Sequence, residues 1–503
     1  MKRPFTTVTV SILAAFILMY FTVFAGLAAA QESQGLEVTV RNVTDGQPLT
    51  PPVVIVHNGS LMNLPEDPEA IMGFAALAES GDPSAFAAAV DTYEGVKSAT
   101  IMDVEGPIPG GSEATVGSIV AVPGDFVSVI SMLACTNDAV SYGTAVVSQD
   151  GGGFAMSSGG VYDAGTEAND ETSATVPCLG GASAGLSAGL GEGMVAPHPG
   201  IEGKADLSKE MHRWDGPAMQ IFVTPAGQAA PDAVDFGLTL ENLTSGQPIT
   251  PPVVVVHDPN VDVFDYTSPD ELDGIDDLAE GGVQDDLVAT LSRMPGVVWV
   301  YDLDSGGPII PGATYTEGKL YGVAGADVTL VGMFACTNDA YIRVTGGVMS
   351  AGGVVSFGDP STALVFDSGS EKNDETMATI PCLGGPEAAL SEGLGEGERS
   401  LHAGIVGNAD LSKETHGWTD ATTARMTLHA AGMVAEESPE PAPPTTDETP
   451  MVDELPEPAP PVTGDMAPGG VVLLAMGVGG AVLVIVGEGF ILVSRRQRKG
   501  VIR

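Results

Sequence analysis

Alternating apolar and polar residues predict β-strands at the start of two similar stretches of the chain. The sequence LEVTVRNVT at 36–44 alternates as a half-buried strand does, and FGLTLENLT repeats the pattern two hundred residues later. Each is followed by Thr-Pro-Pro and a β-branched run, VVIV at 53–56 in the first stretch, which is typical of a buried strand. FVSVISMLAC at 126–135 and DVTLVGMFAC at 327–336 predict a central strand in each stretch.

Helical spacing of apolar residues is confined to short segments. Apolar positions recur at intervals of three and four at 68–78 and 84–90, and again at 269–279 and 284–294. Most of the remaining sequence is rich in Gly, Pro, Asn and Asp, which favour turns. Many strands with few helices predict an all-β fold, an antiparallel β-sandwich with short helical insertions.

The two stretches are copies of one unit. MLACTNDA at 132–139 matches MFACTNDA at 333–340, and YDAGTEANDETSATVPCLGG at 162–181 matches FDSGSEKNDETMATIPCLGG at 366–385. The matching segments lie about 200 residues apart. A repeat of that length can bury its own core, unlike the 20 to 50 residues of a solenoid repeat. We therefore expect two tandem domains, at 31–230 and 231–430.

Both ends of the chain carry membrane signals. Residues 1–30 have a basic start, an apolar run and a small-residue end, which predicts a signal peptide. Residues 470–494 are long and apolar enough for one transmembrane helix, with a buried core helix as the alternative, and the basic tail at 495–503 places that end in the cytoplasm. The acidic, Pro-rich segment 431–469 predicts an extended stalk. The two domains would then be extracellular on a single-pass protein of the cell membrane.

The charge of the chain limits the classes of ligand that it can bind. The chain has 66 acidic and 19 basic residues, which excludes nucleic acid as a ligand because phosphate binding needs a basic surface. Such acidity suits a solubilising or halophilic surface, or a protein that holds divalent cations.

The four cysteines occupy matching positions in the two copies, so pairing within a copy predicts disulfides Cys135–Cys178 and Cys336–Cys382; reduced cysteines that merely pack are the alternative.

Acidic residues gather at two matching places in each copy. In the first copy these are Asp138, just after the first cysteine, and the stretch from Asp163 to Glu171, just before the second. The disulfide would draw the two loops together. Hard oxygen ligands without accompanying histidine or cysteine favour Ca²⁺ over zinc.

These residues resemble the spondin domain, particularly its bacterial form. The resemblance rests on a strand that leads into N-D, then D-A-G-T-E, in a domain that opens with V-T-x-G-Q-P-x-T-P-P, and it covers almost all of both copies. It implies C2-like β-sandwiches that bind calcium and serve adhesion. The implied ligands are Asp138, Asp163 and Glu167, with Asp339, Asp367 and Glu371 in the second copy.

Two departures from the animal members of that family stand in this sequence. Glu167 and Glu371 replace an aspartate, and Ala139 and Ala340 replace the tryptophan that follows the first ligand. The thrombospondin modules that accompany the animal domain are absent from this sequence, so animal partners such as integrins do not transfer.

Other repeated residues offer alternative functions. Three histidine pairs suggest zinc or hydrolase chemistry, and packing or helix capping is the competing interpretation: His57 with His257, His198 with His402, and His212 with His416. Trp214 and Trp418 raise the alternative of a carbohydrate-binding module. We expect a non-enzymatic, calcium-binding adhesion or interaction protein at the cell surface, whose partner is an extracellular protein or glycan.

Overall fold

The computed structural model describes seven segments of the chain: 34–148, 155–180, 191–347, 355–357, 363–384, 395–418 and 423–432. Both copies fall within one compact unit that ends at Glu436. The predicted signal peptide, the predicted transmembrane helix with its basic tail, and all but the first two residues of the predicted stalk lie outside the described residues. Within the segments above, no helix combines the length and apolar character needed to cross a membrane.

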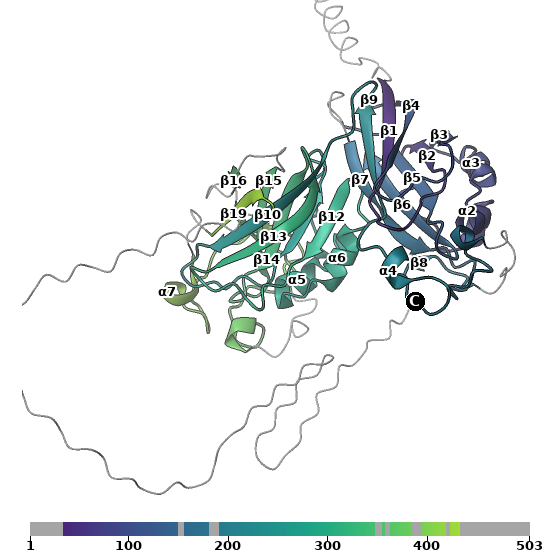
Figure 1. Ribbon diagram of the computed structural model, residues 1–503. Coiled ribbons are helices and arrows are strands. Elements are labelled where there is room, and N and C mark those ends of the chain that lie inside the picture. Colours follow the sequence, from purple (N-terminus) through teal and green to yellow (C-terminus); the bar gives the residue numbers. More distant parts are fainter. Residues whose placement is uncertain are drawn as a thin grey trace, which may run out of the picture. The chain divides into compact units, whose positions relative to one another are not determined.

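The first copy is mostly β-sheet, as expected (Figure 1). Its helices are the 3₁₀-helices η1 (Pro68–Ala70) and η2 (Pro177–Leu179) and the α-helices α2 (Phe74–Ser80), α3 (Ser84–Val90) and α4 (Lys209–His212). Its strands are β1 (Gln34–Asn42), β2 (Val53–His57), β3 (Val96–Ile101), β4 (Glu113–Ala121), β5 (Phe126–Met132), β6 (Ala139–Val146), β7 (Ala155–Asp163), β8 (Ala196–Pro197) and β9 (Met219–Pro225).

One strand joins the two halves of this sheet system. The strand order is β3-β2-β5-β6-β7-β9-β1-β4, with β8 also on β7. The first part of β7 pairs with β9 up to Gly159, and its second part pairs with β6 from Gly160 to Asp163. A Cβ atom at Gly159 would overlap the side chains of Ser141 and Met219, so a larger residue at this change of partner would force both side chains to move.

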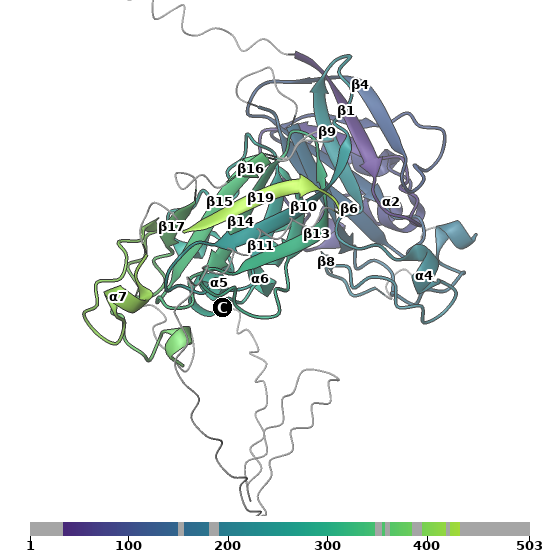
Figure 2. The same cartoon turned by 60° about the vertical axis from the view of Figure 1, so that its left-hand side comes forward.

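The second copy repeats the order of elements, except that two short strands take the place of β7 (Figure 2). Its helices are η3 (Pro269–Glu271), α5 (Ile275–Gly281), α6 (Asp285–Leu291), η4 (Pro381–Leu383) and α7 (Lys413–His416). Its strands are β10 (Ala233–Asn242), β11 (Val253–His257), β12 (Val297–Asp302), β13 (Thr314–Val323), β14 (Asp327–Met333), β15 (Ala340–Gly347), β16 (Val355–Phe357), β17 (Leu364–Asp367), β18 (Ser400–Leu401) and β19 (Ala424–Ala430). Among the described residues they form two sheets, β13-β10-β19-β16 and β12-β11-β14-β15-β17-β18.

Two apolar layers cover the two faces of β2. Val54 and Val56 pack with β1, β5 and β9 in one cluster, while Val53 and Ile55 pack with α2 and α3 in another. The helical segment predicted at 68–78 is divided into η1 and α2, and the one predicted at 84–90 is α3. Helices α2 and α3 cover the outer face of this sheet, and α5 and α6 cover the matching face of the second copy. Because both faces of these strands are buried, the sequences VVIV at 53–56 and VVVV at 253–256 are apolar at every position.

A buried glutamine ties the start of each copy to its disulfide. Gln47 is fully buried, and its side chain donates to the carbonyl oxygens of Cys135 (3.0 Å) and His212 (2.6 Å) and accepts from the N–H of Cys135 (3.1 Å). Gln247 makes the same three bonds in the second copy. Both predicted disulfides are present, Cys135–Cys178 and Cys336–Cys382.

Removing one disulfide should destabilise its copy. Cys135 and Cys178 are 43 residues apart, and the chain-entropy model assigns a loop of this size about 4 kcal/mol. The double substitution Cys135→Ser and Cys178→Ser should lower the urea midpoint of the first copy's unfolding transition. Reductant should lower the midpoint more in the wild type than in the variant, which retains only Cys336–Cys382; equal midpoints without reductant would contradict the expected stabilisation.

Gly46 should not tolerate a side chain. A Cβ atom there would overlap the carbonyl oxygen of Met211, because Gly46 lies directly against the end of α4. Gly46→Ala should cost about 1–3 kcal/mol, as for overpacking in a core. Gly35→Ala is the matched control, since its Cβ would meet nothing within 4 Å. Thermal melting of the two variants measures the difference, and equal melting temperatures would refute the close contact.

Candidate metal centre

Strand pairing places the first two predicted ligands at the same end of the sheet. Asp138 directly precedes β6, and Asp163 is the last residue of β7. Ala139 pairs with Asp163 in the antiparallel ladder, so Asp138 and Asp163 come together although 25 residues separate them in sequence. The pairing of Ala340 with Asp367 does the same for Asp339 in the second copy.

Asp138 is an acidic side chain with no exposed surface, and the two oxygens of its carboxylate have different surroundings. Oδ2 accepts hydrogen bonds from the N–H groups of Thr166 (2.7 Å) and Glu167 (2.9 Å) and from the Thr166 hydroxyl (3.1 Å). Oδ1 is buried, and no hydrogen-bond donor among the described residues reaches it. A buried oxygen in this state is uncommon, because the desolvation cost is not offset.

The second copy reproduces this asymmetry with different donors. Oδ2 of Asp339 accepts from the N–H groups of Ser370 (2.9 Å) and Glu371 (3.1 Å) and from the Ser368 hydroxyl (2.9 Å). Its Oδ1 is also buried without a hydrogen bond in the described part of the chain, and the carboxyl of Asp367 lies close enough to interact with that of Asp339. The hydroxyl donor is Thr166 in the first copy and Ser368, the equivalent of Ala164, in the second. In both copies it is Oδ1 that accepts no hydrogen bond from the described residues.

Burial shifts the titration of both aspartates. Burial raises the pKa of Asp138 to about 7, and the charge of Asp163 adds to the rise against the opposing effect of the backbone hydrogen bonds. Burial likewise raises the pKa of Asp339 to about 7, with Asp367 as the next cause. Without a cation, each carboxyl therefore binds a proton more tightly than an exposed aspartate does.

Asp163 and Asp367 are nearly buried and are held by two donors each. Oδ1 of Asp163 accepts from the N–H of Gly165 (2.8 Å), and Oδ2 accepts from the side-chain amide of Asn169. In the second copy, Gly369 (2.8 Å) and the Asn373 amide play the same parts. Each carboxylate oxygen has a second lone pair, so these bonds leave room for a metal.

The third predicted ligand of each copy lies in the same loop. Glu167 and Glu371 are buried, and their backbone N–H groups bond to the first aspartate. The structure thus brings together the loops that carry all three acids. It does not bring the carboxylates into a tight cluster: among the described residues, the groups of three whose ligand atoms all lie within 4.8 Å are two Cys-Cys-His sets.

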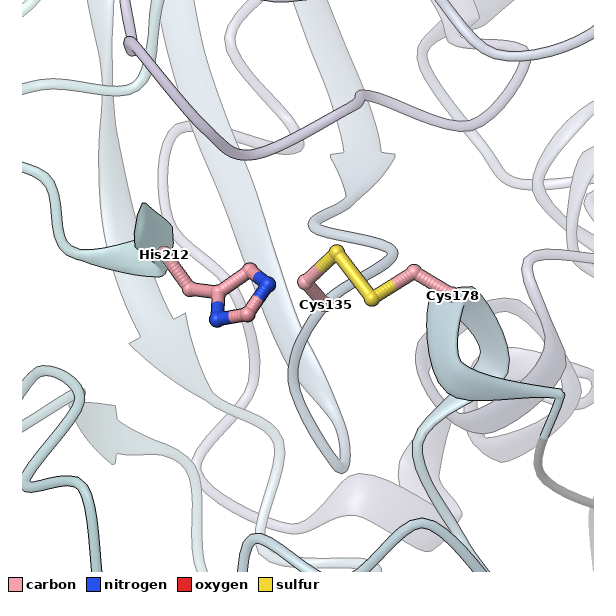
Figure 3. Close-up of side chains that lie close together, drawn as sticks. All are labelled: Cys135, Cys178 and His212. Carbon is pink, nitrogen blue, oxygen red and sulfur yellow. A yellow bond between two sulfur atoms is a disulfide. The ribbon is translucent and has the colours of Figure 1, made fainter. Parts of the chain in front are cut away.

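Those Cys-Cys-His sets are not metal sites. Figure 3 shows the His212 ring beside the Cys135–Cys178 disulfide, and sulfurs bonded to each other are not available as thiolate ligands. Nδ1 of His212 accepts a hydrogen bond from the N–H of Ser208 (2.9 Å), so the ring closes the short helix α4. His416 bonds to Ser412 (3.0 Å) in the same way. Capping is the role that these contacts support.

Two acids in the same stretch hold loops together. Glu171 adopts a left-handed backbone (φ 57°), and its buried carboxylate accepts from the N–H groups of Glu202 (2.7 Å) and Lys204 (2.8 Å). Glu375 (φ 56°) does the same in the second copy. The sequence motif E-x-N-D-E occurs in both copies and marks these acids. The motif alone does not show whether an acid binds a metal or accepts hydrogen bonds from a neighbouring loop.

A cavity of about 120 Å³ reaches one predicted ligand in the second copy. It is lined by Asp367 together with Asn338, Asn373, Glu375 and His402. The wall also includes Leu401, Ile405 and Val406, and the volume and the five polar side chains are sufficient to hold water.

Neither a comparison with protein-family models nor a search of curated proteins finds a match to this chain. The assignment of the site therefore rests on its geometry and on the sequence.

The raised pKa values predict a pH effect on stability in calcium-free protein. Because the folded-state pKa of Asp138 and Asp339 is about 7 against an ordinary 3.8, their contribution is fully present below about pH 4 and is lost as the pH rises through 7. The double variant Asp138→Asn, Asp339→Asn lacks this contribution. Its stability relative to wild type should increase from pH 4 to pH 8, by on the order of 1–4 kcal/mol per site.

The pH experiment compares wild type with variant because other groups titrate as well. Burial lowers the pKa of His57, His198 and His402 to about 4, so these histidines destabilise the fold as the pH falls. Their effect is common to both proteins and cancels in the difference. Urea unfolding in a chelator at several pH values gives that difference, and a flat difference would show that the two carboxyls titrate normally.

Proposed function

We propose that this protein is a non-enzymatic, calcium-binding adhesion or interaction protein of the cell surface, built from two spondin-like, C2-like β-sandwiches. The single observation that carries the proposal is the buried Oδ1 of Asp138 and of Asp339, which accepts no hydrogen bond from the described residues of either copy. A cation bonded to that oxygen would offset its desolvation and hold the carboxylate ionised.

The chemistry of the surrounding groups supports calcium as that cation. The neighbouring acids Asp163 and Glu167 also offer oxygen ligands, and calcium takes six to eight oxygens in flexible geometry. Coordination of this kind tolerates a site whose acids stand further apart than zinc ligands do. In the second copy, the cavity beside Asp367 provides room for the water ligands that would complete the shell.

The two alternatives draw less support from the contacts. Trp214 packs its ring against His198 (centroids 5.3 Å apart), and Trp418 packs against Phe334 and His402 (both 5.2 Å). Rings held in this way have less face to offer a sugar. For a hydrolase, His198 and His402 bond to asparagine side chains, which supply no proton transfer.

Display at the cell surface is the part of the proposal that rests on sequence alone. The signal at 1–30, the stalk at 431–469 and the apolar segment 470–494 motivate a single-pass protein whose two domains face outward. Millimolar extracellular calcium is in the range that weak extracellular sites use. The partner would be an extracellular protein or glycan that recognises the ordered, calcium-loaded loops.

Calcium should raise the melting temperature of the full chain. With dissociation constants on the order of 0.1–1 mM, 10 mM calcium would stabilise each copy by about 1–3 kcal/mol. Asp163→Asn together with Asp367→Asn should remove the rise, because each substitution takes away one charged ligand from its copy. Differential scanning calorimetry with calcium and with chelator measures the effect.

A matched control uses acids of similar type outside the site. Asp67 and Asp206 accept hydrogen bonds from backbone N–H groups in exposed turns, so Asp67→Asn and Asp206→Asn should leave the calcium response intact. An unchanged melting temperature of wild type in calcium would refute the proposed function.

A further inference from the structure

A chain of hydrogen bonds links a histidine to the second predicted ligand in each copy. The N–H of Gly200 donates to Nδ1 of His198 (2.9 Å), and Nε2 of His198 lies 3.1 Å from Oδ1 of Asn169. The side-chain amide of Asn169 then donates to Oδ2 of Asp163. In each of these hydrogen bonds the donor and the acceptor can be identified.

The direction follows from the donors. Because Nδ1 of His198 accepts the Gly200 N–H, it carries no proton, so the neutral ring must carry its proton on Nε2. Nε2 therefore donates to the oxygen of the Asn169 amide, and this turns the amide nitrogen toward Asp163. Burial lowers the pKa of His198 to about 4, which keeps the ring neutral near pH 7.

The second copy contains the same chain on equivalent residues. Gly404 donates to Nδ1 of His402 (2.9 Å), and Nε2 of His402 lies 3.0 Å from Oδ1 of Asn373. The Asn373 amide donates to Oδ2 of Asp367. His402, Asn373 and Asp367 all line the 120 Å³ cavity described above, so the chain runs along its wall.

We propose that His198 and His402 are positioning residues for calcium binding, which fix the carboxylates of Asp163 and Asp367 through Asn169 and Asn373. The inference rests on the proposed function, which it deepens. With the amide held by the histidine, its N–H group fixes the rotamer of the aspartate. If the histidine donor were lost, the amide could turn its oxygen toward the carboxylate, which would repel it. Groups that orient metal ligands in this way typically change metal affinity by about 10- to 100-fold when removed.

Two substitutions of His198 separate hydrogen bonding from ring packing. His198→Phe keeps an aromatic ring against Trp214 but has no donor for Asn169. His198→Gln loses the ring but places an amide N–H as many bonds from the main chain as Nε2 of histidine. His212→Phe is the matched control, since that ring caps Ser208 and has no link to Asp163.

The measurement is calcium titration by calorimetry on the full chain. All proteins carry Asp367→Asn, so that only the first copy reports. His198→Phe should weaken calcium binding about 10-fold or more, whereas His198→Gln and His212→Phe should stay within about threefold of the background protein. Melting in chelator checks that each variant is folded.

The opposite pattern would overturn the inference. If Phe retains the affinity and Gln loses it, ring packing is what matters; if all variants bind equally, the histidine has no part in the site. Either result leaves the proposed function standing, because calcium still binds.

A metal-independent measurement keeps the positioning role testable even if wild type binds no calcium. With ¹⁵N-asparagine labelling, the side-chain amide signal of Asn169, assigned by its loss in Asn169→Leu, should be protected from exchange in calcium-free wild type and His198→Gln. It should lose that protection in His198→Phe. Equal protection in all three proteins would show that the histidine does not orient the amide.

Discussion

The structure of each copy is organised around one buried carboxylate. An aspartate side chain with no exposed surface costs several kcal/mol unless its charge is compensated, so the chain must supply donors at that point or keep the group protonated. Asp138 and Asp339 have donors for one oxygen only. In the loop from β7 toward the second cysteine, two successive backbone N–H groups are directed at that oxygen.

The elements around the carboxylate make the loop geometry rigid. Gln47 and the Cys135–Cys178 disulfide hold the segment before Asp138, and the left-handed Glu171 anchors the chain that follows the acidic loop. A left-handed backbone at a non-glycine residue costs about 1–2 kcal/mol, and it is maintained here by the hydrogen bonds that the Glu171 carboxylate accepts. The same solution occurs in both copies, with Glu375 at the equivalent position. These contacts hold the acidic loop in place before a ligand binds, so binding does not have to order the loop.

Protons and cations compete for the same oxygen in this arrangement. With a pKa of about 7, an empty Asp138 exchanges a proton close to neutral pH, and a cation that bonds to Oδ1 must displace that proton. Calcium binding and pH are therefore linked through one atom in each copy. The two copies need not respond equally, because Ser368 supplies a hydroxyl donor in the second copy where the first has Ala164.

The sequence by itself determined the duplicated organisation, the predominance of β-structure, the short helices and the disulfide pairing. These features depend on local periodicity, or on matching positions in two copies, and both can be read along the chain. The tertiary structure decided which acid does what. Asp138, Glu167 and Glu171 look alike in the sequence, but only packing shows that Asp138 keeps a buried oxygen without a donor and that Glu171 holds a loop. Likewise, His198 reaches Asn169, and through it Asp163, only because β8, which His198 follows, pairs with the end of β7. Burial and hydrogen-bond direction depend on residues distant in sequence, so no local pattern specifies them.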